Sequence, residues 1–239
     1  VFGTTAPTVG AHAEYINLPE DSAIARTPDS LSDAEAVALH PGAMTALPFM
    51  RGAANLQLGQ RILIVGASGG IGTSAVQLAK YFGAHVTGVC STANVALVAS
   101  LGADHVVDYR KEDFTLSAEQ YDVIFDTVGK SAFNKAKRAL KPGGIYLTTI
   151  LSPTILCQMF FTGRFGKKKA QLVFAGLRPV EEKSAILDLL LDLLAVGKFR
   201  PVIDRCYPLA EIAEAHRYVE SGRKTGSVVI QVNDNYSGE

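Results

Sequence analysis

Apolar residues in the middle of the chain follow two alternating spacings. A short apolar run over 62–65 ends at a glycine, and apolar residues then recur every three to four positions over 70–82, which predicts a strand, a turn and a helix. Further strands are predicted over 85–89, 105–107, 123–126 and 144–149, with helices over 93–101 and 132–140. Near-continuous apolar strands separated by helices predict the α/β class with a doubly wound, Rossmann-type parallel sheet.

The two ends of the chain show a different pattern. Short β-like stretches interrupted by Gly and Pro occupy 13–18, 202–207 and 228–232, and a helix pattern covers 209–220. Such short strands bounded by turn residues predict the flanks of a second, β-rich domain.

Helical segments are expected to connect the two domains. Ser32 and Glu35 fit a capping box, and an apolar stripe over 180–196 predicts a helix that packs in a core. We therefore expect residues 1–28 and 198–239 to belong to the β-rich domain, and residues 29–197 to form the Rossmann domain with its connecting helices.

Composition narrows the classes of partner. The 239 residues contain 23 Lys and Arg against 23 Asp and Glu, so there is no overall basic field to attract nucleic acid or a membrane surface, and a small-molecule partner is favoured. The longest apolar stretch, 150–161, is broken by Ser152, Pro153 and Gln158. It is too short and too interrupted for a spanning helix, and we expect a buried or interface segment.

The cysteine pattern bears on the cell compartment. Three cysteines without C-x-x-C spacing argue against a disulfide framework or a structural zinc site and suit a reducing environment. We expect a cytoplasmic protein.

The turn between the first strand and helix fits two kinds of site. Residues 66–70 match G-x-S-x-G, the elbow that presents a nucleophilic serine, here Ser68. A serine hydrolase also needs an acid and a histidine further along the chain, and Asp204 and His216 have the required order. Both fall in the segments assigned to the β-rich domain, so nothing in the sequence places them near Ser68.

The same turn also fits a phosphate-binding loop. Ala67, Gly69 and Gly72 occupy the three small-residue positions that permit a tight turn, close approach of a pyrophosphate and packing of helix on strand. The helix that follows presents N-terminal amides to an anion. A small-residue turn of this kind matches G-x-S-x-G by accident, and we favour a dinucleotide site over the hydrolase.

The end of the second strand bears on which dinucleotide binds. An NAD site places an acidic residue about 20 positions after the glycines, but residues 90–94 here read Cys-Ser-Thr-Ala-Asn. Hydroxyl and amide groups donate to a 2′-phosphate, whereas a carboxylate repels it, so NADPH is favoured over NADH. Arg110 and Lys111 add positive charge after the next strand. Alternatively, Ser91 and Thr92 only cap the helix that follows.

Longer motifs together resemble one known family. They are EYINLPEDS from Glu14, ALHPGAMTAL over 38–47, the segment from Gly59 to Thr92, LGADHVVDYRKEDF over 101–114, YDVIFDTVG over 121–129, LKPGGIYLT over 140–148 and residues 200–232. These residues resemble the zinc-independent branch of the medium-chain dehydrogenases/reductases, the quinone oxidoreductase and zeta-crystallin-like proteins.

The resemblance implies an NADPH-dependent oxidoreductase that transfers hydride to a quinone or an α,β-unsaturated carbonyl. It also implies positions for the cofactor, from the nicotinamide end to the adenosine. The implied cofactor-binding residues are Thr45 beside the nicotinamide; Ala67, Ser68, Gly69, Gly70, Ile71 and Gly72 at the pyrophosphate; Ser91, Thr92 and Asn94 at the 2′-phosphate; Tyr109 and Arg110 at the adenosine; Asp126, Val128 and Gly129 at the ribose; and Leu147 and Thr149, within 147–152, along the nicotinamide.

Zinc is not expected from the resemblance. The zinc-dependent branch has a cysteine where this chain has Pro41, and proline cannot ligate a metal. His40 is adjacent but is expected to be a packed or surface histidine. No side chain is assigned as a general acid, because Tyr207 and His216 fall in segments that fit the core of the flanking domain, and solvent can supply a proton.

Full-length relatives begin with a β-rich, GroES-like domain of which residues 1–28 would be only the tail. The expectation that part of this domain is missing leaves a second function open, an NADPH-binding or interaction module without catalysis. Exposed strand edges in an incomplete domain favour association, and we expect a homodimer.

Overall fold

The structure is a computed structural model that describes residues 1–5, 12–116 and 120–232. These residues form two compact units. One unit contains the first 44 residues together with those from Gly176 onward, and the other is a continuous segment, Thr45–Ala175. The assignment of residues 1–28 and 198–239 to a GroES-like domain stays a prediction.

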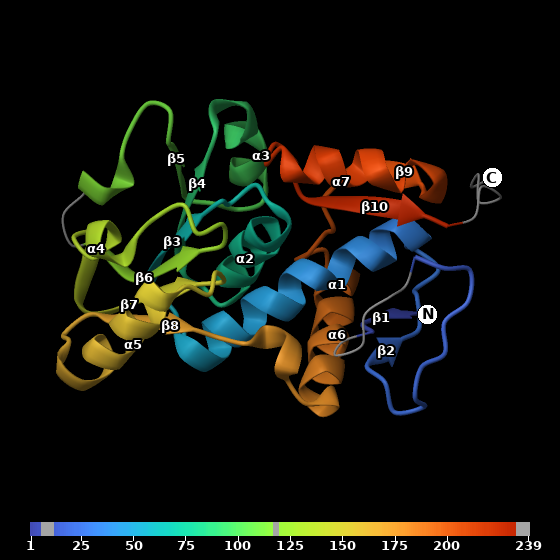
Figure 1. Ribbon diagram of the computed structural model, residues 1–239, viewed down its shortest axis with the longest axis horizontal. Coiled ribbons are helices and arrows are strands. Elements are labelled where there is room, and N and C mark those ends of the chain that lie inside the picture. Colours follow the sequence, from blue (N-terminus) through green and yellow to red (C-terminus); the bar gives the residue numbers. More distant parts are fainter. Residues whose placement is uncertain (6–11, 117–119, 233–239) are drawn as a thin grey trace. The chain divides into compact units, whose positions relative to one another are not determined.

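The continuous unit contains a parallel sheet whose six strands lie within the described residues (Figure 1). The strand order is β5-β4-β3-β6-β7-β8, and every neighbouring pair is parallel. The strands are β3 Arg61–Val65, β4 His85–Cys90, β5 His105–Asp108, β6 Tyr121–Asp126, β7 Leu140–Thr148 and β8 Lys169–Leu172. This arrangement confirms the doubly wound α/β class.

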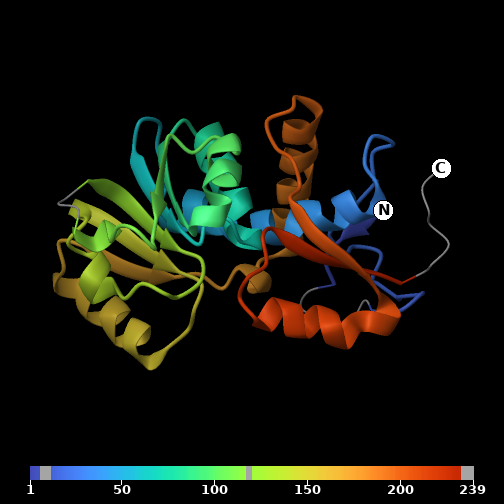
Figure 2. The ribbon, with the colours of Figure 1, turned by 90° about the horizontal axis from the view of Figure 1, so that it is seen from above.

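Helices cover both faces of this sheet. Figure 2 shows α2 and α3 on one face and α4 and α5 on the other. The helical segments of this unit are the π-helical turn Pro48–Ala53, α2 Gly70–Tyr81, the 3₁₀ turn Thr92–Asn94, α3 Val95–Ser100, the 3₁₀ turn Phe114–Leu116, α4 Phe133–Ala136 and α5 Pro153–Phe165. Covering both faces explains why the central strands are apolar throughout rather than alternating.

The core lies on both sides of the central strands. On one side Leu63, Ile124 and Tyr146 pack with residues of α4 and α5. Phe49 stacks on Phe125, with ring centroids 4.9 Å apart, so the segment after α1 closes part of the core. Burial of these large side chains supplies most of the driving force for folding this unit.

The sequence misplaced some elements. The helix predicted over 132–140 is only the single turn α4, because β7 already begins at Leu140. The edge strand β8 was not predicted, since Lys-Ala-Gln-Leu has no apolar run and owes its strand structure to pairing with β7. No strand forms over 13–18, where the side chains are mostly exposed.

The other unit combines two small strand pairs with helices. Its elements are β1 Phe2–Gly3, β2 Ile24–Ala25, most of α1 Asp33–Leu47, α6 Val180–Ala195, β9 Ile203–Pro208, the 3₁₀ turn Leu209–Glu211, α7 Ile212–Glu220 and β10 Ser227–Gln231, and the 3₁₀ turn Ala175–Leu177 lies at its border. β1 pairs antiparallel with β2, and β9 pairs parallel with β10. The predicted capping box is confirmed: Ser32 N–H donates to Glu35 Oε2 at 3.0 Å, and Glu35 N–H donates to Ser32 Oγ at 3.3 Å.

A glycine in β4 makes room for the turn that follows β3. A Cβ atom added at Gly88 would lie 2.4 Å from Val98 Cγ1 and 3.0 Å from Ala67 Cβ. Ala67, which occupies the first small-residue position of the turn, is therefore accommodated by the absence of a side chain in the neighbouring strand.

We expect Gly88→Ala to lower the free energy of unfolding by about 1–3 kcal/mol, because a methyl group is forced into a filled site. Val98→Ala removes the nearest atom, so the double variant should lose less stability than the two single losses added together. Urea unfolding measures all three. Gly163→Ala is the control, since nothing lies within 4 Å of a Cβ there and alanine favours a helix; additive losses would contradict the explanation.

Candidate functional site

The carboxyl ends of β3 and β6 meet where the chain connections reverse direction. From β3 the chain proceeds to β4 and β5 on one side, whereas β6, β7 and β8 extend on the other. Ligands of doubly wound sheets bind at such a switch point. Thr127 joins the two strand ends, because its N–H and hydroxyl both donate to Val65 O, at 3.1 and 2.8 Å.

The turn after β3 is built by close backbone contacts. Gly66 has a φ of 77°, a conformation that favours glycine. A Cβ atom at Gly72 would lie 2.0 Å from Gly66 O, so the third glycine lets α2 pack directly on the end of β3. At Gly69 the nearest atom to an added Cβ is Gly66 O at 3.4 Å, which leaves space above the turn.

The first amides of α2 have no side-chain partner at the N-cap. The N-cap residue is Gly69, which makes no side-chain capping bond. The first N–H groups of any helix lack partners within the helix, and here they belong to Gly70, Ile71 and Gly72. Gly69, Gly70 and Ile71 are only half-buried. The turn therefore offers uncapped amides and the positive end of a 12-residue helix to an anion.

Ser68 is engaged within the turn. Its side chain is buried, and its Oγ accepts a hydrogen bond from Asn94 Nδ2 at 2.9 Å. In the other unit, Asp204 accepts hydrogen bonds from the Tyr218 hydroxyl at 2.6 Å and from Thr225 N–H, while the His216 side chain is exposed. Asp204 does not orient His216, so the acid and base of the hydrolase alternative are not paired.

The rim predicted to hold a 2′-phosphate contains a carboxylate that sequence spacing did not indicate. Asp108 ends β5 beside Cys90 of β4, and it accepts a hydrogen bond from the Thr92 hydroxyl at 2.6 Å. This bond and the Arg110 N–H lower the pKa of Asp108. In this arrangement the Thr92 hydroxyl donates its proton to Asp108 and not toward the rim.

Other residues on this rim remain accessible. The side chains of Tyr109 and Arg110 are exposed, and Ser91 is half-buried. The Lys111 Nζ atom lies 3.8 Å from Asp108 Oδ2. Burial, and after it the charge of Asp108, raises the pKa of Cys90 to about 11, so that thiol is protonated at neutral pH.

Asp126, at the end of β6, organises the next loop rather than facing solvent. Its side chain is completely buried. Oδ1 accepts from the N–H groups of Val128 and Gly129, and Oδ2 accepts from Ser131 N–H and Oγ, at 2.8–3.1 Å. The Tyr146 hydroxyl lies 3.0 Å from Oδ2. A carboxylate engaged in this way shapes the loop and has no exposed oxygen for a ribose.

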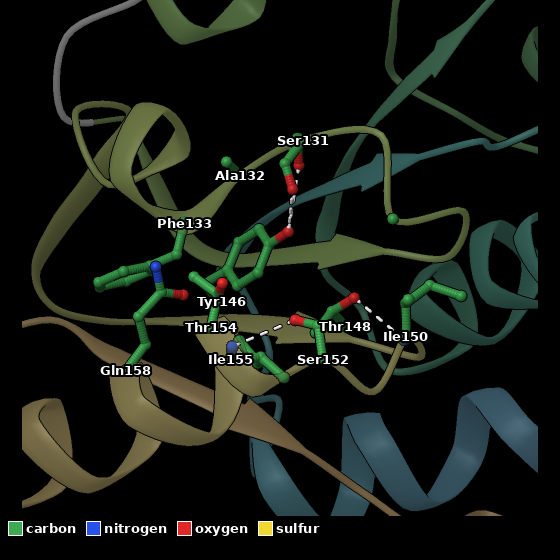
Figure 3. A pocket seen from close by; sticks show the side chains of 11 residues that line it. Ser131, Ala132, Phe133, Tyr146, Thr148, Ile150, Ser152, Thr154, Ile155 and Gln158 are labelled. Atoms are coloured by element: carbon green, nitrogen blue, oxygen red, sulfur yellow. Dashed lines mark hydrogen bonds between the residues drawn. The ribbon is translucent and has the colours of Figure 1, made fainter.

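A cavity of about 250 Å³ lies beside this loop (Figure 3). Hydroxyl groups of Ser131, Tyr146, Thr148, Ser152 and Thr154 come from β7, the loop after β6 and the start of α5. The rest of the lining is Gly129, Ala132, Phe133, Ile150, Ile155 and Gln158. The cavity thus borders two predicted cofactor-binding segments. These are the loop after β6, predicted to contact the ribose, and the segment after β7, predicted to lie along the nicotinamide.

Tyr146 is the titratable side chain among the residues that line this cavity. Burial and the nearby charge of Asp126 raise its pKa. The hydroxyl is therefore a hydrogen-bond donor at neutral pH and a poor acid. Of the neighbouring predicted residues, Leu147 is fully buried and Thr149 is half-buried, with its hydroxyl donating to Thr127 O at 3.2 Å.

Pro41, which stands where the zinc-dependent branch is expected to have a cysteine, lies in α1. His40 is buried, its Nδ1 has no hydrogen-bond partner, and Pro41 next to it is exposed. Within the described ranges no group of three His, Cys, Asp or Glu side chains is arranged to hold a metal ion, so these residues do not fit a zinc site. Thr45, the predicted nicotinamide neighbour, is half-buried in the last turn of α1.

These features define a class and a family. A doubly wound sheet with an uncapped glycine turn at its switch point defines a Rossmann-type domain, the class of fold in which dinucleotides bind at that point. The chain matches the zinc-binding dehydrogenase family over residues 101–230, and it belongs to that family. The predicted membership of the medium-chain dehydrogenases/reductases is thereby confirmed.

Individual proteins are similar over most of the chain. The mitochondrial NAD(P)H oxidoreductase RTN4IP1 of Mus musculus is 34% identical over 93% of this chain. The chloroplastic NADPH-dependent alkenal/one oxidoreductase of Arabidopsis thaliana is 31% identical over 92% of it. The structure of the Coxiella burnetii quinone oxidoreductase matches 86% of it with a TM-score of 0.75 at 28% identity. The chain spans 61%, 53% and 63% of these proteins, respectively.

The prediction of a cytoplasmic location is wrong on this comparison. One of these relatives is named as mitochondrial and another as chloroplastic, which points to organelles. The prediction failed because the cysteine pattern indicates a reducing environment and carries no information about which compartment supplies it.

Three residues of the site were not found from the sequence. The sequence predicts only a strand at Gly88, although a glycine inside a strand is the available signal for close packing. Thr127 follows β6, and Asp108 ends β5. Their hydrogen-bond partners, Val65 and Thr92, lie 62 and 16 positions away along the chain. Only strand order brings those partners together.

Burial lowers the pKa of His40 to about 4, which makes stability depend on pH. Below about pH 6.5 the unfolded chain binds a proton that the folded chain excludes, so the free energy of unfolding should fall by up to about 3 kcal/mol between pH 6.5 and 4. His40→Phe should remove this part of the loss in urea titrations at each pH. The exposed His105→Gln is the control, and equal pH slopes for His40→Phe and wild type would contradict the prediction.

Proposed function

We propose that this chain binds NADPH at the turn over 66–72 and forms part of an oxidoreductase that transfers hydride to a quinone or an α,β-unsaturated carbonyl without zinc. The observation that carries the proposal is the uncapped amino end of α2 at the switch point of the sheet. An N-cap glycine with open space above it suits a pyrophosphate, whose charge replaces the missing cap.

The names of the relatives support the reaction class. The mouse protein is an NAD(P)H oxidoreductase, the Arabidopsis protein an NADPH-dependent alkenal/one oxidoreductase and the Coxiella protein a quinone oxidoreductase. Two of these names give a nicotinamide cofactor, and two give an electron-poor acceptor, an alkenal/one or a quinone. When bound, the cofactor supplies the hydride, and the protein supplies orientation and shelter from water.

The residues of the chain divide this work along the crevice. Amides around Gly69 to Gly72 bind the pyrophosphate. Ser91, Asn94 and Arg110 are proposed to contact the 2′-phosphate, whereas the Thr92 hydroxyl donates to Asp108. The remaining proposed contacts are Thr45, Ser68, Tyr109, Val128, Gly129 and Thr149. Ala67, Leu147 and Asp126 are completely buried, so we propose that they shape the site from beneath, Asp126 by positioning the loop over 127–131.

An acceptor that is already electron-poor does not need a Lewis acid. The described residues present no fitting metal-ligand group, and Tyr146 is a poor acid because its pKa is raised. We therefore propose that solvent supplies the proton that follows hydride transfer.

A nucleotide-binding module without catalysis is the second candidate. It is kept because the chain spans 61% of the mouse relative, so the activity of that whole protein is a proposal for this chain. A homodimer remains part of the proposal for either candidate.

We expect Gly69→Asp to weaken NADPH binding strongly without unfolding the protein. The nearest atom to an added Cβ is 3.4 Å away, and aspartate is a favourable N-cap that should keep or raise the thermal midpoint. Its charge opposes the pyrophosphate, so the Kd should rise by roughly 100-fold or more in calorimetry. Gly69→Ser is the matched control, which adds a cap without a charge.

The same preparations distinguish the two candidates. NADPH oxidation with 9,10-phenanthrenequinone or an enone, lost in Gly69→Asp, supports the oxidoreductase. Saturable binding without turnover supports the module. Equal NADPH affinity of wild type and Gly69→Asp would remove the turn from the proposed site.

Arg110→Gln should reduce the preference for NADPH. An exposed guanidinium beside the 2′-phosphate contributes a charge-assisted hydrogen bond, so its loss should weaken NADPH binding by about 10-fold or more and leave NADH binding unchanged. Calorimetric titration with both nucleotides measures the ratio, and Arg138→Gln is an exposed control far from this rim. A parallel loss for NADPH and NADH would contradict a role at the 2′-phosphate.

A further inference from the structure

The positive charge of this chain is concentrated in one segment. From Thr127 to Val180 the sequence contains ten of the 23 Lys and Arg residues, and all 23 Asp and Glu residues lie outside this stretch. A net charge of zero for the whole chain therefore hides a strongly basic segment. Most of it, up to Ala175, belongs to the unit that carries the sheet and includes α4, β7, α5 and β8.

Helix α5 in this segment is apolar on two opposite faces. Its inner face carries Ile155, which is buried in the core cluster, and Met159, which packs against that cluster. Thr162 also faces inward, because its Oγ1 accepts a hydrogen bond from Ala170 N–H of β8 at 3.1 Å. These contacts fix the rotation of the helix about its axis.

The outer face of α5 exposes large apolar side chains. Phe160 is 69% exposed, Phe161 61% and Leu156 50%. Together with Cys157 and Arg164, which are also exposed, they form a continuous stripe at helical spacing. We call these five residues the α5 stripe. Phenylalanines exposed to this extent on neighbouring positions mark an interaction surface.

Lysines and arginines border the stripe at the carboxyl end of α5. Lys167 and Lys169 are exposed just after the helix, and Lys137 and Arg138 are exposed after α4. These two segments lie close together, because Lys168 Nζ donates to Lys137 O at 2.9 Å and Gly143 N–H of β7 donates to Lys167 O at 2.7 Å. Figure 1 shows α4 and α5 beside the half of the sheet that contains β6, β7 and β8.

Carboxylates from neighbouring elements only partly offset this charge. Asp122 of β6 pairs with Lys141 at 2.8 Å, and Asp113 lies close enough to Lys135 for the lysine to lower the pKa of Asp113. The basic residues beside the stripe, Lys137, Arg138, Lys167 and Lys169, lie in the short segments 137–139 and 166–169, which contain no acidic residue.

We propose that the α5 stripe and the four basic residues beside it bind an anionic membrane surface. Phenylalanine and leucine side chains enter the boundary between headgroups and acyl chains, while lysine and arginine side chains contact anionic headgroups. A second copy of this chain is a poorer occupant, because two equally basic faces repel each other. This site is independent of the proposed nucleotide site.

Attachment at the surface is the mode that the structure allows for this patch. Among the described residues, no helix combines the length and the hydropathy required to cross a bilayer. The expectation that the chain does not contact membranes came from its net charge, and the uneven distribution of that charge is why we revise it.

Vesicle cosedimentation of the full chain tests the proposal. Binding should be strong to phosphatidylcholine vesicles that contain phosphatidylserine, weak to phosphatidylcholine alone, and weaker as salt increases. The F160S/F161S variant should lower the partition coefficient at least tenfold. Neutralising Lys167 and Lys169 to Gln should lower it about fivefold for each charge.

Matched controls lie elsewhere in the same unit. Phe174→Ser removes another exposed phenylalanine, and Lys111→Gln removes an exposed lysine at the opposite edge of the sheet. Neither should change vesicle binding. A dye on Cys157, in a Cys206→Ser background, should shift to the blue with anionic vesicles, whereas a dye on the exposed Cys206 in a Cys157→Ser background should not.

Several results would overturn the proposal. Equal binding to neutral and anionic vesicles would remove the role of the basic residues. No vesicle binding, together with a dimer in sedimentation velocity that F160S/F161S dissociates, would assign the stripe to self-association. Tighter binding to a nucleic acid duplex than to anionic vesicles would assign the basic residues to that partner. If F160S/F161S lowers the thermal midpoint, vesicle binding by the Lys167 and Lys169 variants and the emission of the dye on Cys157 still test the proposal.

Discussion

The site in this protein depends on a buried carboxylate, that of Asp126. It sits at the end of a central strand without access to solvent and is satisfied by the loop that follows it and by Tyr146 of the next strand. A buried charge without partners would be costly, so the loop must close around it. This closure fixes the position of Val128 and Gly129 beside the glycine turn, and with it one wall of the crevice.

The other wall is set by the absence of side chains. Gly72 lets α2 contact the backbone of Gly66, and Gly88 in the neighbouring strand accommodates Ala67. Small residues at these positions bring the amino end of a helix to the switch point without a capping side chain. The same constraint therefore shapes the core and leaves the amides that we assign to a pyrophosphate.

The two proposed binding surfaces use different parts of one unit. The nucleotide site lies at the carboxyl ends of the strands, where β3 and β6 diverge. The proposed membrane-binding surface lies on α5 and on loops at its carboxyl end. A protein that reduces quinones or enones would gain from lying close to a membrane, because such apolar acceptors partition into lipid.

The sequence alone determined the doubly wound class, the strand-turn-helix over 61–81 and the family, because hydrophobic periodicity and small residues at fixed spacing are local properties. The cytoplasmic location was predicted wrongly, since amino-acid composition does not identify the cell compartment. Only the tertiary structure decided which distant residues come into contact and which side chains are exposed, because these depend on strand order and on the rotation of each helix about its axis. Asp108 reaches Thr92 because β5 pairs with β4, and Lys-Ala-Gln-Leu becomes β8 because β7 offers it an edge. Phe160 and Phe161 face outward because Ile155 and Met159 hold the opposite face of α5 in the core. Such contacts between distant residues form only when the chain packs.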